Sequence, residues 1–344
     1  MIRYPVLAIL FLAAPLSAQS RGPTGTIIVS NMNDNTATII DAATGKTIAT
    51  VPTGEGPHEV AISRDGKWAV ASNYGVRGKP GNSLTVIDVA KAAVERTITL
   101  EGQQRPHGVV FLPGDTTLAV TAETKGMVLL VDFRSGAVAG TIPTSGRAPH
   151  VVAATAKGDR LYAGNIGSGT VAEMNPATRD TARAIRVARQ PEGIAVAPNG
   201  ASVWAGSNAD SVVLVFDPRN ATAVDTLRGF GLPYRIAITP DSRLAVITDP
   251  MRAEVRVFTV SDRKQKFLLA IPRDSLVATA EVPGSPSPEG VTTSSDGKWA
   301  FVTLQGRNRL ITIDLERGTI VSYAVIGTWS DGVGYSSMRS VFRR

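Results

Sequence analysis

The sequence predicts an all-β protein in which seven similar units, each made of four short strands, close into a ring. Three observations support this fold class. The 344-residue chain contains 33 Gly and 21 Pro, too many helix breakers for long helices. A proline-led segment recurs about every 42 residues. The apolar runs between these segments are rich in β-branched residues and show no helical period.

Six segments of the chain align on a proline followed by an apolar run. Their prolines are Pro57, Pro106, Pro149, Pro191, Pro233 and Pro288, and a seventh, degenerate copy begins at Ser330. Most neighbouring copies are 42 or 43 residues apart, whereas two intervals are 49 and 55 residues long. Periods of about 40 to 45 residues with several strands in each are typical of β-propeller blades. We therefore predict a seven-bladed β-propeller.

Each unit divides into four expected strands, which the first unit illustrates. Strand A, residues 61–63, follows the proline, and the Asp65-Gly66 turn leads into strand B at residues 68–72. Strand C covers residues 84–89 and strand D residues 95–100. A side chain that can open the next turn stands at the end of strand C in five units: Asp88, Asp132, Asn175, Asp217 and Asp314.

The two ends of the chain together supply one complete unit. Residues 26–31, 36–41 and 46–52 read as strands B, C and D with no strand A before them. Residues 331–336 read as a strand A with nothing after it. We expect these four strands to form the blade that closes the ring and hides the sheet edges.

The N-terminal segment has the features of a secretory signal peptide. It has an early cation at Arg3, an apolar stretch from Pro5 to Leu16 that is too short to span a membrane, and a small residue at Ala18. We expect residues 1–18 to be cleaved, leaving residues 19–344 as a single propeller domain, periplasmic or secreted, without a membrane span and monomeric. The chain has no Cys, which excludes disulfides, thiolate metal ligands, a cysteine nucleophile and a lipid-anchored cysteine.

The repeats also resemble a known family. The pattern of a proline, a glycine two residues later, an apolar run and an Asp-Gly or Asn-Gly turn is seen in PEGIAVAPNGASVWAGSN (191–208), and SLTVIDV (83–89) supplies the strand that follows it in a unit. This pattern resembles the YVTN-repeat β-propellers, the YncE-like and surface-layer-like group, over residues 25–337. The resemblance implies the fold but no single function, since relatives include non-enzymatic secreted proteins, a nucleic-acid-binding periplasmic member, lactonase-like enzymes and a haem-carrying propeller of nitrite reductase. Function must therefore be argued from a site.

All three histidines of the chain occupy the same repeat position, directly after the blade proline. They are His58, His107 and His150, and the other four units place Glu192, Tyr234, Glu289 and Asp331 there. In a propeller this position lies where the chain enters the innermost strand. We therefore predict a polar ring around one mouth of the central channel.

Three interpretations of this ring remain open from the sequence. The histidines can be inherited blade residues that cap strand A. They can ligate a divalent transition metal, with Glu192 or Glu289 orienting a histidine or acting as a base. They can also bind a small anion together with arginines that flank the blade prolines: Arg105, Arg147, Arg189 and Arg235.

A second polar ring is expected where strand B ends on the same rim. Its members are Asn31, Asn73, Glu123, Asn165, Asn208, Asp249 and Gln305. Most are interpreted as turn-forming residues. Glu123 is the exception to follow, because it brings a charge close to the histidines.

Two insertions depart from the regular repeat. Residues 73–83 separate strands B and C of the first unit and would overhang the histidine rim, as a gate or as a solvated Gly-rich loop. Residues 261–275 are assigned to the opposite face, where a basic RKQK and an apolar FLLAI would form a docking patch or a short flap.

The leading functional hypothesis is a propeller that binds a small anionic ligand or a protein partner on its histidine-bearing face without turnover. The alternative is a metal-dependent, lactonase-like hydrolase or lyase in the channel. Nucleic-acid binding is ranked below both because, despite a net charge of +7, the Lys and Arg residues are scattered among acidic residues.

Overall fold

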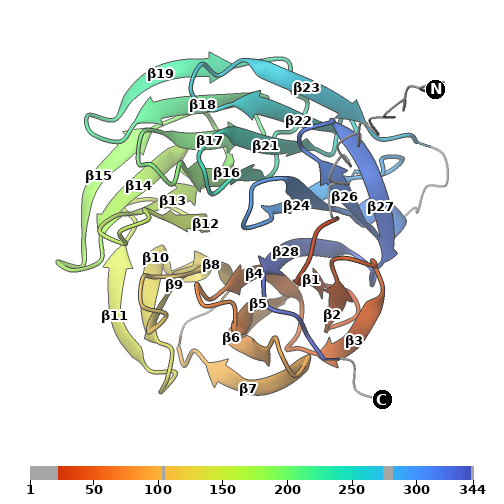
Figure 1. Ribbon diagram of the computed structural model, residues 1–344. Helices are drawn as coiled ribbons and strands as arrows, with labels where there is room; N and C mark the ends of the chain where they lie inside the picture. Colours follow the sequence, from red (N-terminus) through yellow and green to blue (C-terminus); the bar gives the residue numbers. More distant parts are fainter. Residues whose placement is uncertain (1–21, 103–104, 274–281, 342–344) are drawn as a thin grey trace, which may run out of the picture.

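The computed structural model describes residues 22–102, 105–273 and 282–341, and it confirms the predicted seven-bladed ring. Seven four-stranded antiparallel sheets surround a central channel (Figure 1). Within the described residues, the only helical elements are the 3₁₀ turns η1 (Glu123–Lys125) and η2 (Gln305–Arg307). No helix in this part of the chain is long and apolar enough to cross a membrane. The expected signal peptide, residues 1–18, lies outside the described ranges.

The strands follow the chain in order from the channel outward in every blade except the closing one. The closing blade is β28 (Ser330–Ser336), β1 (Thr26–Asn31), β2 (Thr36–Asp41) and β3 (Thr47–Pro52). The next three blades are β4 (Pro57–Ile62), β5 (Trp68–Val76), β6 (Lys79–Asp88) and β7 (Ala93–Thr99); β8 (Pro106–Phe111), β9 (Thr117–Ala122), β10 (Met127–Asp132) and β11 (Val138–Pro143); and β12 (Pro149–Ala154), β13 (Leu161–Asn165), β14 (Thr170–Asn175) and β15 (Asp180–Arg186). The last three are β16 (Pro191–Val196), β17 (Val203–Ser207), β18 (Val212–Asp217) and β19 (Thr222–Leu227); β20 (Ile236–Ile238), β21 (Leu244–Asp249), β22 (Glu254–Thr259) and β23 (Gln265–Ala270); and β24 (Pro288–Thr293), β25 (Trp299–Leu304), β26 (Arg309–Asp314) and β27 (Thr319–Val325).

The ring is closed by pairing between the two ends of the chain. Strand β28 pairs antiparallel with β1, from Thr26 opposite Ser336 to Asn31 opposite Ser330. The Tyr335 ring stacks on Phe301 of the preceding blade with a centroid distance of 5.3 Å. The closing blade therefore has the predicted composition, three N-terminal strands and one C-terminal strand.

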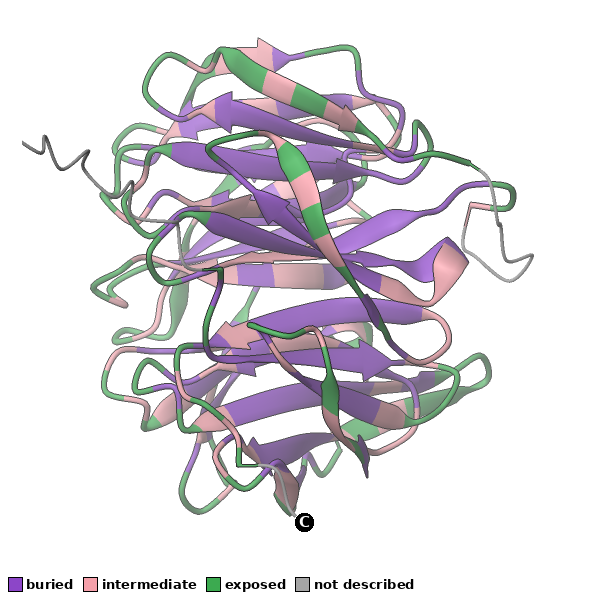
Figure 2. Ribbon diagram, turned by 45° about the vertical axis from the view of Figure 1, so that its right-hand side comes forward, coloured by how far each residue is buried: buried purple, intermediate pink, exposed green. Residues whose placement is uncertain are grey.

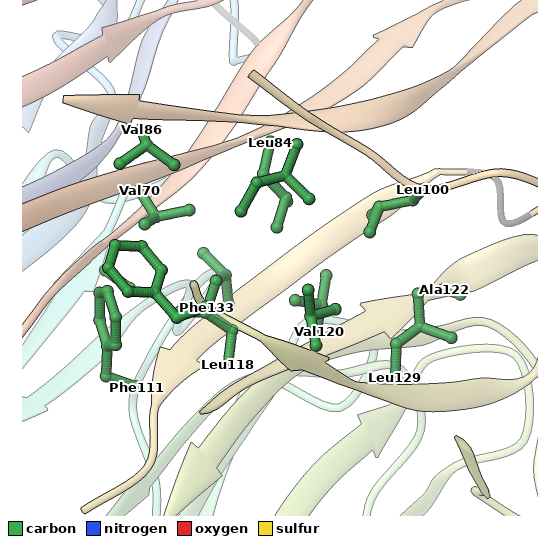
Figure 3. Close-up of a cluster of buried hydrophobic side chains, with 14 residues drawn as sticks. Val70, Leu84, Val86, Leu100, Phe111, Leu118, Val120, Ala122, Leu129 and Phe133 are labelled. Atoms are coloured by element: carbon green, nitrogen blue, oxygen red, sulfur yellow. The ribbon is translucent and has the colours of Figure 1, made fainter. Parts of the chain in front are cut away.

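The hydrophobic core lies between neighbouring blades. In each blade the second strand from the channel is mostly buried and the innermost strand is buried or half-buried, whereas the outer strand is mostly exposed or half-buried (Figure 2). Figure 3 shows one inter-blade layer, in which β5 and β6 pack against β9 and β10. Its labelled side chains include Val70, Leu84, Val86, Leu118, Val120 and Leu129.

A β-bulge at the start of the innermost strand aims side chains at the channel. Pro57 is paired with Asn73 and Val60 with Ala71, so that His58 and Glu59 together lie opposite one residue of β5. Such two-against-one pairing redirects side chains. The same register shift follows the blade proline in β8, β12, β16 and β24.

The second position of this bulge is crowded in most blades. Four blades have glycine there, and a Cβ atom would lie between 1.9 and 2.6 Å from backbone atoms of the next blade. These residues are Gly108, Gly193, Gly290 and Gly332. Glycine at this position thus lets neighbouring blades approach closely around the channel.

Both insertions differ from the sequence-based interpretation. Residues 73–83 are a continuation of β5 and β6, with Gly75 paired to Pro80 and Val76 to Lys79, so this segment is a hairpin and not a loop. The assignment of residues 261–275 was wrong. Residues 265–270 form the ordinary outer strand β23, and the additional residues lie in 271–287, between β23 and β24. The described residues at its two ends, 271–273 and 282–287, lie at the histidine-bearing end, because they follow β23 and precede the innermost strand at Pro288.

We expect deletion of residues 330–344 to prevent ring closure. It removes β28, exposes the edge of β1 and uncovers the Phe301 ring, so the product should aggregate or lose fixed tertiary structure. Size-exclusion chromatography and near-ultraviolet circular dichroism measure this. Deletion of residues 342–344 alone is the control and should leave a soluble monomer. A folded, soluble protein from the longer deletion would contradict the closure mechanism.

Candidate functional site

The three histidines converge at one end of the channel. The His107 ring lies between the other two, with centroid distances of 4.0 Å to His58 and 3.4 Å to His150. Their backbones are fixed by the neighbouring blade, since Ser72 Oγ donates to the His107 carbonyl oxygen and Thr121 Oγ1 to that of His150, both at 2.6 Å. The predicted grouping of His58, His107 and His150 is therefore present in the structure.

The outer two histidines are paired with carboxylates. His58 Nδ1 lies 2.8 Å from Asp331 Oδ2. His150 Nε2 lies 2.9 Å from Glu192 Oε1, and its Nδ1 lies 3.5 Å from Glu123 Oε2. Both nitrogens of His150 thus face acidic groups, which favours the doubly protonated imidazolium.

The charges shift the pKa values of this pair in opposite directions. Burial lowers the pKa of His150, but Glu192 and Glu123 outweigh it and raise that pKa to about 9. Burial raises the pKa of Glu192, but His150 and Arg235 outweigh it and lower that pKa to about 2. At neutral pH the two side chains form an ion pair.

A buried arginine links three carboxylates across the channel. Arg235 Nη2 lies 2.6 Å from Glu59 Oε1, Nη1 lies 2.6 Å from Glu192 Oε1, and Nη2 lies 3.6 Å from Asp331 Oδ2. Arg235 and Glu59 occupy the second bulge position, where four other blades have glycine. Sequence reasoning missed Glu59. The sequence does mark this residue, because Glu59 and Arg235, which carry opposite charges, replace the glycine that four blades have at this repeat position.

His107 differs from the other two histidines because it has no partner. It is fully buried, and neither ring nitrogen makes a hydrogen bond with any described residue. Burial, together with the charges on His150, His58 and Arg235, holds its pKa well below the usual value. A buried polar group without a hydrogen bond is costly, so an ordered water, an ion or another ligand is expected to satisfy the two nitrogens of this imidazole.

The hairpin of β5 and β6 supplies a further group that sequence reasoning did not single out. Tyr74 packs edge-on against the His58 and His107 rings, each at a centroid distance of 5.3 Å. Its hydroxyl donates to Glu123 Oε2 at 2.9 Å and accepts from Arg105 Nη1 at 2.7 Å. Tyr74, Arg105 and Glu123 thus form the side of the site nearest the hairpin.

Several predicted members lie apart from this cluster. Arg147 donates to the Gly167 carbonyl oxygen, and Arg189 pairs with Asp210; both arginines are exposed. Glu289 accepts from Ser287 Oγ at 3.0 Å and from Gln305 Nε2 at 2.6 Å. Tyr234 contributes indirectly, because the Arg235 guanidinium lies 4.3 Å from the centre of its ring. Of the four rim arginines, the structure thus brings Arg105 and Arg235 to the histidine cluster and leaves Arg147 and Arg189 apart from it.

The second polar ring needs one correction. The strand-end position paired with the blade proline is Asn73 in one blade but Ala122, Ser207 and Leu304 in three others. Glu123, Asn208 and Gln305 thus lie one residue beyond the position assigned to them, where they can reach the rim side chains.

Asn73 within β5 and Asp249 at the end of β21 hold the loop that leads into strand A of their own blades. Gly54 N donates to Asn73 Oδ1 at 3.1 Å, and Gly231 N donates to Asp249 Oδ2 at 2.7 Å. These two side chains thus order the loop that precedes the innermost strand.

The densest set of possible metal ligands in the described chain is His58, Glu59 and His107. One ligand atom from each lies within 4.8 Å of the others. This set replaces His150 by Glu59 relative to the three-histidine hypothesis, since both nitrogens of His150 already face carboxylates. Glu59 Oε1 is held by Arg235, so Oε2 is the Glu59 oxygen that remains for a metal.

Comparison with known proteins supports the fold. The sequence model of the YNCE-like beta-propeller family matches residues 131–258. The repeats in this region are similar to those of YncE-like β-propellers. No protein of the curated set gives a significant match.

Two solved structures share the architecture. Hydrazine synthase from Kuenenia stuttgartiensis superposes with a TM-score of 0.69 at 17% identity, covering 89% of this chain and 99% of that one. A protein of unknown function from Desulfotomaculum acetoxidans gives a TM-score of 0.73 at 14% identity, covering 91% and 99%. At these identities the likeness shows the fold alone.

We expect Arg235→Met to destabilise the protein strongly. The substitution leaves Glu59, Glu192 and Asp331 without their shared cation, and uncompensated buried charge costs about 3–5 kcal/mol. Urea unfolding measures the loss, and adding Glu59→Gln should recover part of it. Arg219→Met is the control, because the Arg219 side chain is 85% exposed and its pairing with Asp217 should contribute nothing measurable. An Arg235→Met protein as stable as wild type would contradict the role of this network.

Proposed function

We propose that the protein is a ligand-binding propeller whose ligand is a divalent transition-metal ion, held at the channel mouth by His58, Glu59 and His107. The observation that carries this proposal is His107, a fully buried imidazole with two unpartnered nitrogens beside another imidazole and a carboxylate. Neutral imidazole is a preferred ligand of zinc, copper, iron and nickel.

The carboxylate next to His58 supports this assignment. Asp331 lies 2.8 Å from His58 Nδ1 and therefore leaves the Nε2 atom of His58 as the ligand atom. A metal-bound histidine commonly donates its other N–H group to a carboxylate, which fixes the ring and increases its basicity. The distance between His58 Nδ1 and Asp331 Oδ2 suits such a pair.

The charge balance favours a cation over an anion. The contacts around the histidines join four carboxylates, those of Glu59, Glu123, Glu192 and Asp331, to three positive groups, those of Arg105, Arg235 and His150. Because a histidine must be neutral to ligate a metal, the cluster in its metal-binding form carries a net charge of −1. A divalent ion is therefore attracted to the site, whereas a free anion would meet an excess of carboxylates.

The same proposal places the protein in the periplasm or outside the cell. Support comes from the N-terminal sequence, in which Arg3 precedes the apolar stretch from Pro5 to Leu16. An exported binding module agrees with the leading hypothesis from the sequence.

The test is metal binding by purified protein. We expect untagged protein purified without chelator to carry near-stoichiometric metal by elemental mass spectrometry, and protein stripped with chelator to rebind Zn²⁺ in calorimetry. His107→Ala should lower the affinity at least about tenfold, because it removes one of three ligands. Glu289→Gln changes a buried residue at the same repeat position outside the donor set, and its affinity should be unchanged.

Two results would contradict the proposal. One is wild-type protein that binds no zinc, copper, iron or manganese. The other is equal metal affinity in wild type and His107→Ala, provided that circular dichroism shows the variant to be folded.

A further inference from the structure

We infer that the metal at this site keeps an open coordination position, and that this position accepts a small carboxylate whose charge is met by Arg105. The inference depends on the proposed metal function and names the class of molecule that the loaded site takes. Its basis is the juxtaposition of a three-ligand donor set with a solvent-facing rim that carries the Arg105 and Tyr74 side chains.

The donor set itself leaves room for an exogenous ligand. Two imidazoles and one carboxylate provide three donors, whereas transition metals take four to six. Sites with this composition are the open type in proteins, with water or substrate completing the shell. Among the described residues, the remaining histidine, His150, is occupied by Glu123 and Glu192 on its two nitrogens.

Exposure shows the side from which the open position is reached. The side chains of Glu59, Glu123 and His150 are 17%, 20% and 14% exposed. Those of Asp331 and Arg235 are 1% and 7% exposed, and His107 is fully buried. The cluster is thus sealed at the level of Asp331 and Arg235, and it opens towards solvent beside Glu59, Glu123 and His150.

Binding of a metal ion reverses the sign of the net charge of the whole cluster. The described cluster carries −1 with neutral ligand histidines, so a divalent ion changes its net charge to +1. One small monoanion would restore neutrality. Placing this charge at the metal costs little, because the bound ion attracts it directly.

Arg105 is the cation best placed to meet the carboxylate. Arg235 is buried and already bound to Glu59 and Glu192, and His150 is held by its two carboxylates. Arg105 is only half-buried, and its Nη1 atom donates to the Tyr74 hydroxyl at 2.7 Å. Its guanidinium lies 4.7 Å from the centre of the Tyr74 ring, and that ring packs against both His58 and His107, so one aromatic ring separates Arg105 from two of the metal ligands. A planar guanidinium matches a carboxylate better than a spherical anion.

The test uses the cobalt-loaded protein and acetate as the probe. The visible absorption of bound Co²⁺ reports both metal binding and any change in its coordination. We expect acetate to shift this spectrum saturably at constant ionic strength, whereas acetamide, a neutral molecule of the same shape, should leave it unchanged. Arg105→Gln should weaken acetate binding at least about tenfold without abolishing the cobalt spectrum. Arg147→Gln, an exposed arginine of the neighbouring blade, is the matched control and should bind acetate like wild type.

The possible failures are distinguishable. A protein that binds no Co²⁺ overturns the proposed function and this inference together. A cobalt-loaded protein whose spectrum ignores acetate, or responds equally to acetamide, overturns the inference alone. Acetate binding that is equal in wild type and Arg105→Gln overturns the role of Arg105.

Discussion

The channel mouth depends on one buried guanidinium, that of Arg235. It contacts three carboxylates, those of Glu59, Glu192 and Asp331, each from a different blade. Without Arg235 these carboxylates would repel one another in a site largely closed to water. Because Arg235 neutralises part of this charge, the cluster can retain enough carboxylates to attract a cation and still fold. The ion pair between Glu59 and Arg235 also ties together blades that are 176 residues apart in the chain.

The backbone geometry explains why these charges meet at all. A bulge after the blade proline turns two consecutive side chains towards the channel, and glycine at its second position lets most blades pack closely. Glu59 and Arg235 replace that glycine in two blades. Their long side chains enter the channel, where they form contacts that a ring of seven identical blades could not make.

Much of the fold could be predicted from the sequence, because each blade repeats the same proline, turn and strand pattern, and the incomplete units at the two ends are complementary. The histidine cluster followed from the same repeat. The register of Glu123, Asn208 and Gln305 could not be predicted from the repeat, because a shift of one residue at the end of a strand leaves the apolar pattern unchanged. Glu59 could not be assigned from spacing either, since its partner Arg235 comes from a distant blade. The insertion was assigned to residues 261–275 instead of to the connection between β23 and β24, because the apolar sequence of β23 is also what an inserted hydrophobic flap would have.

The three histidines share a sequence position, yet their environments are unequal. His58 is oriented by Asp331, His150 is fixed between Glu123 and Glu192, and His107 has no partner among the described residues. An inherited capping role predicts similar hydrogen bonds for all three, which the structure does not show. The carboxylates that create the difference come from other blades. The repeat therefore explains why the three histidines share a position, and the residues that differ between blades explain why their environments differ. Because of these unequal environments, His107 and His58 are the candidates for metal ligands, and His150 is a structural cation beside them.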